Sequence, residues 1–337
     1  MFALCRIPES AIESAVMHPE LFEIPFIHLS VKSYGFMMVI GFLAAVTVIR
    51  RLSVKITPDP QMITNAALYS LIGGVVGARI FFVIHYWESF AAHPIEVFYI
   101  WQGGLELLGG VVLAIGVIVF YLFYHKLPVR KYLDILAIGL MLALVFGRIG
   151  CFLNGCCYGK PTDFPLAVRF PYHSFAYLSQ TRPDTERNRT EPQLELPEEY
   201  FGYEDEKGDF YPGLKPWKYL SDQQKIEVTR GEYRCLPVHP TQLYSSAIAA
   251  FWCLMLYLFW RRTERAERSA GSGLLTKPGS IFALMLIFYG ISRFSIEFMR
   301  DDNPFELAVL TISQLLGIGM ILLGMALAAV FHFMKRA

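Results

Sequence analysis

Charged side chains are scarce in this sequence. Asp, Glu, Lys and Arg make up 18% of the 337 residues, whereas soluble globular chains carry about 25%. Basic and acidic residues nearly cancel, and the formal net charge of +1 gives no general attraction for nucleic acid. No internal repeat and no low-complexity tract is visible. These absences argue against a typical soluble domain, a repeat array and a nucleic-acid-binding protein.

The start of the chain lacks the pattern of a secretory signal, which is a basic segment followed by an apolar core of about 7–15 residues. Residues 11–29 instead mix Glu with Val, Met, Leu, Ile and Phe. That mixture is typical of a segment lying on a membrane surface. We therefore expect residues 1–33 to form an N-terminal interfacial segment.

Apolar residues, in contrast, make up 54% of the chain. A bilayer core is about 30 Å thick, so a spanning helix needs about 20 mostly apolar residues. Seven runs come close to this length: 34–49, 66–84, 105–124, 132–146, 243–260, 281–298 and 308–333. Because backbone in lipid must bond to itself, each run is expected to be helical. The sequence predicts an all-α polytopic membrane protein with about seven transmembrane helices, rather than a soluble protein with seven buried helices.

Basic residues predict the orientation of these spans. Lys and Arg gather in the segments that follow spans one, three and five, at residues 50–55, 125–131 and 261–268. Residues 85–104, between spans two and three, contain no Lys or Arg. Because positive loops stay in the cytoplasm, we expect the N-terminus outside and the C-terminus in the cytoplasm.

The same pattern divides the chain into four parts. Residues 34–161 hold spans one to four, and residues 239–337 hold spans five to seven. Between them, residues 162–238 are rich in Pro, Tyr, Glu, Asp and Arg and contain no run long enough to cross a membrane. We expect these residues to form an insert domain on the outer side.

Several ionisable residues fall inside the apolar runs, where they are costly and rarely face lipid. Arg79, Arg148 and Arg293 lie near the outer ends of the even-numbered spans, and Glu106 lies near the outer start of span three. Guanidinium groups that meet at one depth suit an anionic ligand such as phosphate. Structural alternatives remain open: Arg79 can extend toward water, and Arg293 can simply pair with Glu297 one turn along the helix.

Further polar residues lie near the predicted ends of the spans, Asp134 on the inner side and the others on the outer side. Asp134 lies at the inner start of span four, where we expect it to face cytoplasmic water. His239 opens the segment HPTQLY, where the insert re-enters the membrane; it suits a base near neutral pH or a structural hydrogen bond. Tyr34 and Tyr244 are either interfacial aromatics or hydroxyl donors to a lipid headgroup.

The sequence contains six cysteines, of which Cys253 lies within span five. On the predicted outer side, a disulfide of Cys151 with Cys156 or Cys157, or of Cys235 with either of the latter, is one interpretation; small packed thiols are another. Zinc sites favour four ligands and the C-x2-C spacing, whereas this run reads C-x4-C-C. We therefore expect no metal and no cofactor.

Four segments, in order, resemble the prolipoprotein diacylglyceryl transferase family. They are SYGFMMVIGF at 33–42, GGLELLGG at 103–110, GRIGCFLNGCCYG at 147–159, and HPTQLY at 239–244 followed by RFSIEFMR at 293–300. The third resembles the family signature Gly-Arg-x-Gly-Asn-Phe-x-Asn-x-Glu-x-x-Gly. The likeness covers nearly the whole chain except about 162–235.

The resemblance implies an activity: transfer of a diacylglyceryl group from phosphatidylglycerol to the lipobox cysteine of a prolipoprotein, with release of glycerol phosphate. The implied partners are phosphatidylglycerol, the prolipoprotein signal peptide and membrane lipid, with no nucleic acid. By residue matching, Arg148 binds the lipid phosphate, and Arg293 and Glu297 are the family's paired Arg and Glu. The further lipid-binding residues that the resemblance implies are Tyr34, Asn154, Gly159 and Tyr244. Arg79 is expected to bind lipid as well, because it lies at the same predicted depth in the membrane as Arg148 and Arg293.

Three positions depart from the family pattern. Leu108 stands where the family typically has a His, and Cys151 and Cys156 replace the signature's first Asn and its Glu. The usual base is thus missing, and Glu106 or His239 is expected to replace it, unless the substrate thiol ionises unaided. The alternative functions are a membrane thiol–disulfide oxidoreductase using Cys156 and Cys157, and an altered family member that only binds lipid.

Overall fold

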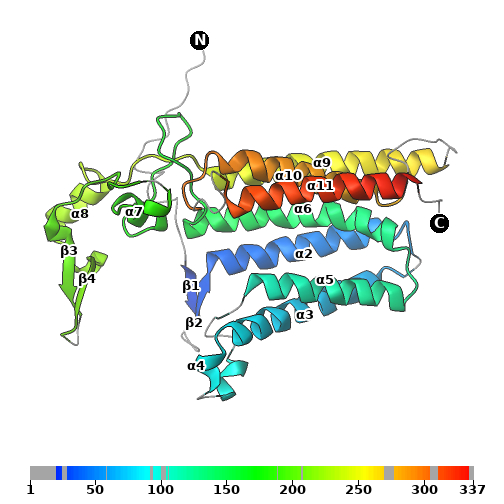
Figure 1. The fold of residues 1–337 in the computed structure, drawn as a ribbon, viewed down its shortest axis with the longest axis horizontal. Helices are drawn as coiled ribbons and strands as arrows, with labels where there is room; N and C mark the ends of the chain where they lie inside the picture. Colours follow the sequence, from blue (N-terminus) through cyan, green and yellow to red (C-terminus); the bar gives the residue numbers. More distant parts are fainter. Residues whose placement is uncertain are drawn as a thin grey trace, which may run out of the picture. The chain divides into compact units, whose positions relative to one another are not determined.

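The computed structural model is mostly helical (Figure 1). It describes residues 20–24, 29–57, 59–91, 94–99, 104, 106–187, 189–205, 208–268, 277–303 and 310–333. Residues 1–19 of the expected interfacial segment, Cys5 among them, lie outside this part of the chain, and so does the side chain of Leu108.

Six helices of the described residues are long and apolar enough to cross a membrane. Their bounds are α2 (Ser33–Ser53), α3 (Gln61–His85), α6 (Val129–Asn154), α9 (Thr241–Arg268), α10 (Ser280–Glu297) and α11 (Ile312–Phe333). A shorter apolar helix, α5 (Leu107–Tyr124), matches the third predicted span. The prediction of a helical, polytopic membrane protein is confirmed.

Helix α6 is longer than the sequence suggested. The predicted span ended at Phe146, but the helix continues to Asn154 and includes Arg148 and Cys151. Glycine and polar residues after Phe146 suggested a loop, yet Gly147 and Gly150 lie inside the helix. The first half of the signature is therefore helical, and only its second half is a turn.

The remaining elements are short. Strands β1 (Glu20–Ile24) and β2 (Leu29–Lys32) form an antiparallel hairpin directly before α2, and α4 (Trp87–Ala91) and η1 (Pro94–Phe98) follow α3. The insert, residues 162–238, contains an antiparallel hairpin and small helices: α7 (Phe175–Gln180), η3 (Thr185–Arg187), η4 (Glu198–Tyr200), β3 (Phe201–Glu204), β4 (Phe210–Leu214), η5 (Trp217–Tyr219) and α8 (Asp222–Thr229).

The chain divides into two compact units. The first unit comprises Met1–Phe42, Met141–Leu254 and Met285–Ala326, and the second comprises Leu43–Leu140, Met255–Leu284 and Leu327–Ala337.

Polar side chains and an aromatic stack join the helices of the first unit. The indole of Trp252 on α9 stacks on Phe288 of α10 with 4.1 Å between ring centroids, and its Nε1 donates to Ser292 Oγ at 2.9 Å. Ser246 Oγ, also on α9, donates to the carbonyl of Val145 on α6 at 3.0 Å. Such interhelical hydrogen bonds matter in a membrane, because lipid is as apolar as a leucine side chain and gives helices no hydrophobic reason to associate.

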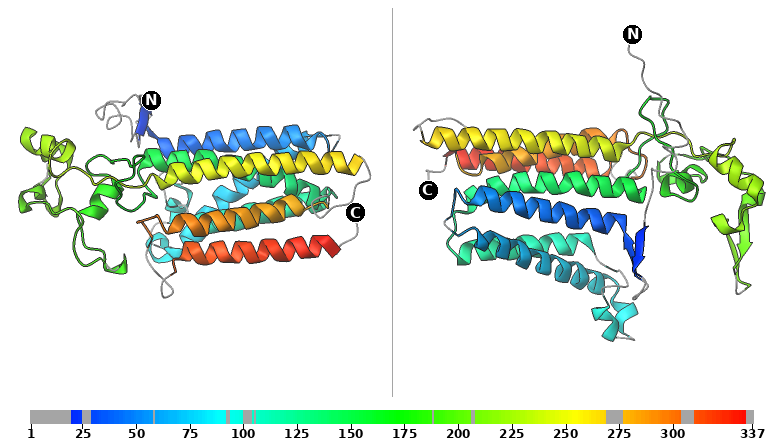
Figure 2. Two further views of the ribbon diagram at one scale, coloured as in Figure 1. Left: turned by 90° about the horizontal axis from the view of Figure 1, so that it is seen from above. Right: turned by 180° about the vertical axis from the view of Figure 1, so that it is seen from behind.

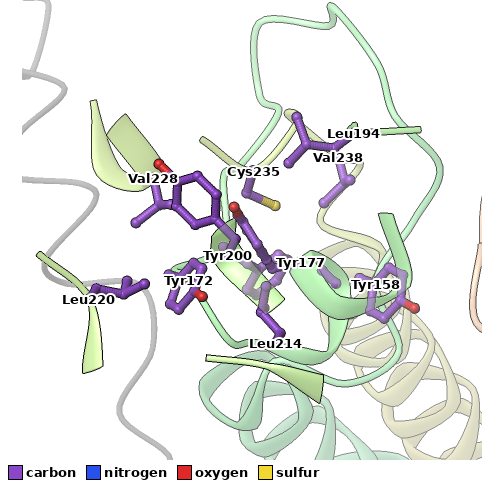
Figure 3. Close-up of a cluster of buried hydrophobic side chains, with 12 residues drawn as sticks. Tyr158, Tyr172, Tyr177, Leu194, Tyr200, Leu214, Leu220, Val228, Cys235 and Val238 are labelled. Carbon is purple, nitrogen blue, oxygen red and sulfur yellow. The ribbon is translucent and has the colours of Figure 1, made fainter. Parts of the chain in front are cut away.

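The insert has a core of its own, made mainly of tyrosine. Tyr177 and Tyr200 are fully buried, and Figure 3 shows their rings beside Cys235. Tyr177 Oη donates to the carbonyl of Tyr233 at 2.7 Å, and Tyr200 Oη donates to the carboxylate of Glu227 at 2.6 Å. A tyrosine core is stable only when each hydroxyl finds a partner, and this one meets that condition.

Two arginines of the insert bind the segment that follows α10. Arg189 Nη1 lies 3.2 Å from the Asp301 carboxylate, and Arg187 donates to the Asp301 carbonyl. The Asp301 amide in turn donates to the carbonyl of Tyr158 at 3.2 Å. Burial raises the pKa of Asp301 above its ordinary value, and the positive charges of Arg189 and Arg187 oppose this effect.

In the second unit, glycines allow α3 and α5 to run side by side (Figures 1 and 2). A Cβ placed on Gly77 would lie 2.5 Å from the carbonyl oxygen of Gly109, and a Cβ on Gly110 would lie 2.9 Å from that of Gly74. Small residues of this kind let helix backbones approach each other closely in a membrane.

Asp134 differs from the sequence-based expectation that it faces water. The side chain is buried, and its two oxygens accept the backbone N–H groups of Gly279 at 2.7 Å and Phe282 at 3.0 Å. The first N–H groups of a helix have no partner within the helix, and a carboxylate also suits the positive end of the helix dipole. Asp134 therefore caps the start of α10 within the second unit.

The glycine contact between α3 and α5 can be tested with two Gly→Ala variants. We expect Gly77→Ala to destabilise the protein by about 1–3 kcal/mol, because the added methyl group must displace the backbone of Gly109. Gly116→Ala on α5 is the matched control, since nothing lies within 4 Å of its Cβ position. Thermal unfolding in detergent measures both, and equal behaviour of the two variants would contradict the contact.

Candidate functional site

Arg148 lies on the last turns of α6, in the first unit, beside the start of α2. The neighbouring Gly150 allows this closeness, since a Cβ there would lie 3.3 Å from the ring of Tyr34 and 3.2 Å from the Cβ of Met37. Arg148 and Tyr34 are near enough to interact electrostatically. The Gly-Arg-x-Gly run thus places a tyrosine hydroxyl and a guanidinium group near each other.

Arg148 and Arg293 line the same small cavity, although they come from different helices. The cavity has a volume of about 20 Å³, which is room for about one water molecule. Polar groups on its wall come from three helices: Arg148 on α6, Ser245 on α9, and Tyr289, Ser292 and Arg293 on α10. Two positive charges with hydroxyl groups around so small a space offer hydrogen bonds to a single oxygen atom of an anion such as phosphate.

Glu297 holds Arg293 in this position. Its Oε2 lies 3.0 Å from Arg293 Nη1 and 3.8 Å from Arg300 Nη1. Its Oε1 accepts a hydrogen bond from Thr311 Oγ1 at 2.9 Å and another from Asn303 Nδ2. The Glu297 side chain is only 1% exposed, so it is a buried carboxylate whose charge is balanced by two arginines.

The turn of the signature is fixed by close backbone contact. The Gly159 amide donates to the His239 carbonyl at 3.0 Å, and a Cβ on Gly159 would lie 2.6 Å from that oxygen and 2.8 Å from the carbonyl oxygen of Met299. No other residue fits between these two backbones without moving one of them. Asn154, at the end of α6, forms a side-chain hydrogen bond with Cys156.

Three cysteines meet beside this turn. The Sγ atoms of Cys151, Cys156 and Cys157 all lie within 4.8 Å of one another. The five cysteines of the described residues carry free thiols, so none of the expected disulfides is formed. Hydrogen bonds from the Cys151 and Cys156 thiols lower the pKa of Cys157 against the opposing effect of burial, and the positive charges of Arg300 and Arg148 add to this.

Cys235 is unlike these three thiols. It lies in the core of the insert, where its Sγ is 3.4 Å from Gln180 Oε1. Burial raises its pKa to about 12, so it stays protonated and unreactive. Small-residue packing accounts for Cys235 fully.

His239 and Tyr244 lie at the start of α9 with 6.1 Å between their ring centroids. His239 Nδ1 and the Tyr244 hydroxyl are both buried and find no hydrogen-bond partner among the described residues. Buried polar atoms without a partner cost free energy, so in a native structure they point to a ligand or bound water.

Arg79 and Glu106 belong to the second unit. Arg79 donates from Nε to the carbonyl of Val97 at 2.8 Å, from Nη1 to Gly104 at 2.9 Å and from Nη2 to Glu96 at 2.6 Å. It therefore fastens η1 and Gly104 to α3. The carboxylate of Glu106 is partly exposed and lies 3.5 Å from His85 Nδ1.

A family model described as prolipoprotein diacylglyceryl transferase matches residues 19–330 of the chain. The chain belongs to the prolipoprotein diacylglyceryl transferase family. The phosphatidylglycerol–prolipoprotein diacylglyceryl transferase of Clostridium tetani is 29% identical over 322 residues, which cover 95% of this chain and 100% of that protein. The protein of the same name from Burkholderia cenocepacia is 30% identical over 340 residues, covering 96% and 98%.

A third relative of this name, from Buchnera aphidicola, is 29% identical over 306 residues, covering 88% of this chain and 90% of that protein. The family resemblance carried by the four sequence segments is thereby confirmed. Membership of this family and the six apolar helices together support a multi-pass protein of the bacterial inner membrane.

In this diacylglyceryl transferase family member, one residue of the site escaped the sequence analysis. Arg300 is 8% exposed, and its Nε and Nη2 donate to the two oxygens of Asp302 at 2.8 and 2.7 Å. Sequence reasoning misses it, because it follows the sixth apolar run, 281–298, and stands where a loop is expected. Its spacing of seven from Arg293, which is two helical turns, was the available signal.

Replacement of Glu297 tests the charge cluster. We expect Glu297→Ala to destabilise this transferase family member by about 3–5 kcal/mol, because Arg293 would be left largely buried without its carboxylate, whereas Arg300 would keep Asp302. Asp222→Ala is the control, since Asp222 is 99% exposed and pairs only on the surface with Lys225; its effect should stay below about 1 kcal/mol. Denaturant titration in detergent compares the two, and a stable Glu297→Ala protein would argue against the cluster.

Proposed function

We propose that this chain transfers the diacylglyceryl group of phosphatidylglycerol to the thiol of a prolipoprotein lipobox cysteine and releases glycerol phosphate. The names of its relatives, which match nearly the whole chain, support this reaction. Within the structure, the supporting observation is that Arg148 and Arg293 line one cavity.

The proposed chemistry needs positive charge at the lipid phosphate. The cysteine sulfur forms a bond to the terminal glyceryl carbon, and the bond from that carbon to the phosphate oxygen breaks. The electron pair of the broken bond stays on the departing glycerol phosphate, and the thiol proton passes to a base. Because negative charge grows on the phosphate as the bond breaks, preplaced guanidinium groups stabilise the transition state more than the bound lipid.

Each remaining site residue has a proposed part in this arrangement. Glu297 aims Arg293 at the phosphate, and Gly159 shapes the turn beside it. Tyr34, Asn154 and Tyr244 offer hydrogen bonds to the lipid headgroup. Arg79 is also proposed for lipid binding, although three carbonyls already accept its hydrogen bonds.

The proposal includes seven spans, with the N-terminus and the insert outside and the C-terminus in the cytoplasm. Helix α5 has 18 residues; at a rise of about 1.5 Å per residue it extends about 27 Å, close to the bilayer core of about 30 Å. Arg50 and Arg51 in the last turn of α2 suit a cytoplasmic end. In this orientation Arg148 and Arg293 lie near the outer leaflet, where the prolipoprotein arrives.

The lipid phosphate site is tested by Arg148→Ala. With phosphatidylglycerol and a lipobox peptide supplied to purified protein, mass spectrometry should detect the diacylglyceryl adduct for the wild type. We expect the variant to be slower by about 100-fold or more, the usual cost of removing one preplaced donor from a transition state. Arg182→Ala, at an exposed position of the insert, should keep wild-type activity. Wild-type protein that binds the lipid but forms no adduct would make this a lipid-binding family member only.

The general base is tested with Glu106→Gln and His239→Ala. His239 is favoured by its buried Nδ1, which has no hydrogen-bond partner in the described part of the chain, whereas Glu106 already faces His85. Loss of a general base costs about 100- to 10,000-fold in rate, and the loss should shrink at high pH, where the substrate thiol ionises by itself. If both variants keep full activity from neutral to alkaline pH, neither residue is the base.

A further inference from the structure

The turn after α6 brings together three sulfur atoms that the proposed transfer reaction does not use. Cys151 is on the last turn of α6, and Cys156 and Cys157 follow directly after it. The three Sγ atoms lie within 4.8 Å of one another. Among the described residues, no other three or more His, Cys, Asp or Glu side chains come together in this way. The C-x4-C-C spacing in the sequence is not that of a zinc site. In the folded turn, however, the three sulfur atoms are close enough together to bind one metal ion.

The backbone of this turn is held in a costly shape. Cys157 has a φ of 62° and Gly155 a φ of 73°, and the left-handed region is unfavourable for any residue with a Cβ. Two side chains from α9 fix the turn: Gln242 Nε2 donates to the Cys156 carbonyl at 2.8 Å, and Thr241 Oγ1 donates to the Cys157 carbonyl at 2.6 Å. The carbonyls are thus held by α9, and the sulfurs are left facing one another.

The charges around the sulfurs suit thiolates. The positive charges of Arg148 and Arg300 both act on Cys157. Three thiolates around a singly charged cation carry a net charge of −2, so positive charge nearby stabilises the site. Hard ions such as Mg²⁺ and Ca²⁺ prefer oxygen ligands, so the cluster excludes them by its donor atoms.

We propose that Cys151, Cys156 and Cys157 form a three-thiolate site for a soft monovalent cation of the Cu⁺ type. Thiolate ligands select Cu⁺, Zn²⁺ and iron–sulfur clusters from the biological metals. Structural zinc takes four protein ligands in a tetrahedron, and the described residues offer three here. Each thiol that becomes a ligand releases its proton, so binding is accompanied by proton release. The inference does not depend on the proposed lipid transfer.

Competition with a chromogenic Cu⁺ chelator tests the site. The reduced, full-length protein in detergent is mixed anaerobically with the coloured chelator complex, and the loss of colour reports transfer of Cu⁺. We expect the wild type to remove one ion per chain and to become more heat-stable as it does so. Cys151→Ser, Cys156→Ser and Cys157→Ser should each lose most of this binding.

Cys253→Ser is the matched control, because it removes a thiol of α9 outside the cluster and should bind as the wild type does. Cys156→Ser is the decisive variant should the others fold poorly, since Cys156 is partly exposed and Ser is nearly the same size. Equal Cu⁺ uptake by Cys156→Ser and the wild type would overturn the site, and so would uptake of Zn²⁺ but not Cu⁺.

Formation of the diacylglyceryl adduct is measured in parallel. A cysteine variant that loses Cu⁺ binding but keeps transfer supports a metal site that is independent of the reaction. A cysteine variant that keeps Cu⁺ binding contradicts the site, whether or not it keeps transfer.

Discussion

The carboxylate of Glu297 is the group on which the candidate site depends. An arginine inside an apolar helix bundle is stable only when its charge and its N–H groups are satisfied, and one buried carboxylate serves both Arg293 and Arg300. Thr311 and Asn303 both donate hydrogen bonds to Oε1 of that carboxylate. With Glu297 holding it from one side, Arg293 presents its charge to the cavity that it shares with Arg148. The pair is therefore structural, and in the proposed reaction it also aims Arg293 at the lipid phosphate.

The site is built on helices rather than on loops. Arg148 and Arg293 lie within α6 and α10, and the first unit joins these helices to α9 through Ser246 and Trp252. Charged groups carried by packed helices lose little freedom when a ligand binds, which favours catalysis by prearranged charge. The turn after α6 is also held rigidly. Side chains of α9 donate hydrogen bonds to the carbonyls of Cys156 and Cys157, and Gly159 packs between the backbones of His239 and Met299.

Much of this could be predicted from the sequence, because apolar length and Lys and Arg placement are local properties. The spans, the family and the pairing of Arg293 with Glu297 at i+4 all followed from short stretches of sequence. Contacts that depend on how the chain folds did not follow in this way. Asp134 caps α10 through residues more than a hundred positions away. Arg300 binds Asp302 only because the chain turns between them. The cysteine cluster was judged by spacing, and spacing does not reveal a left-handed turn at Cys157.

The link between the insert and the segment after α10 has a consequence for how the first unit is held together. Arg187 and Arg189 bind Asp301, while the adjacent Asp302 holds Arg300 through two hydrogen bonds. Arg300 in turn lies beside Glu297, which pairs with Arg293. Two consecutive acidic residues thus connect the insert, with its tyrosine core, to the buried charges of the transmembrane helices.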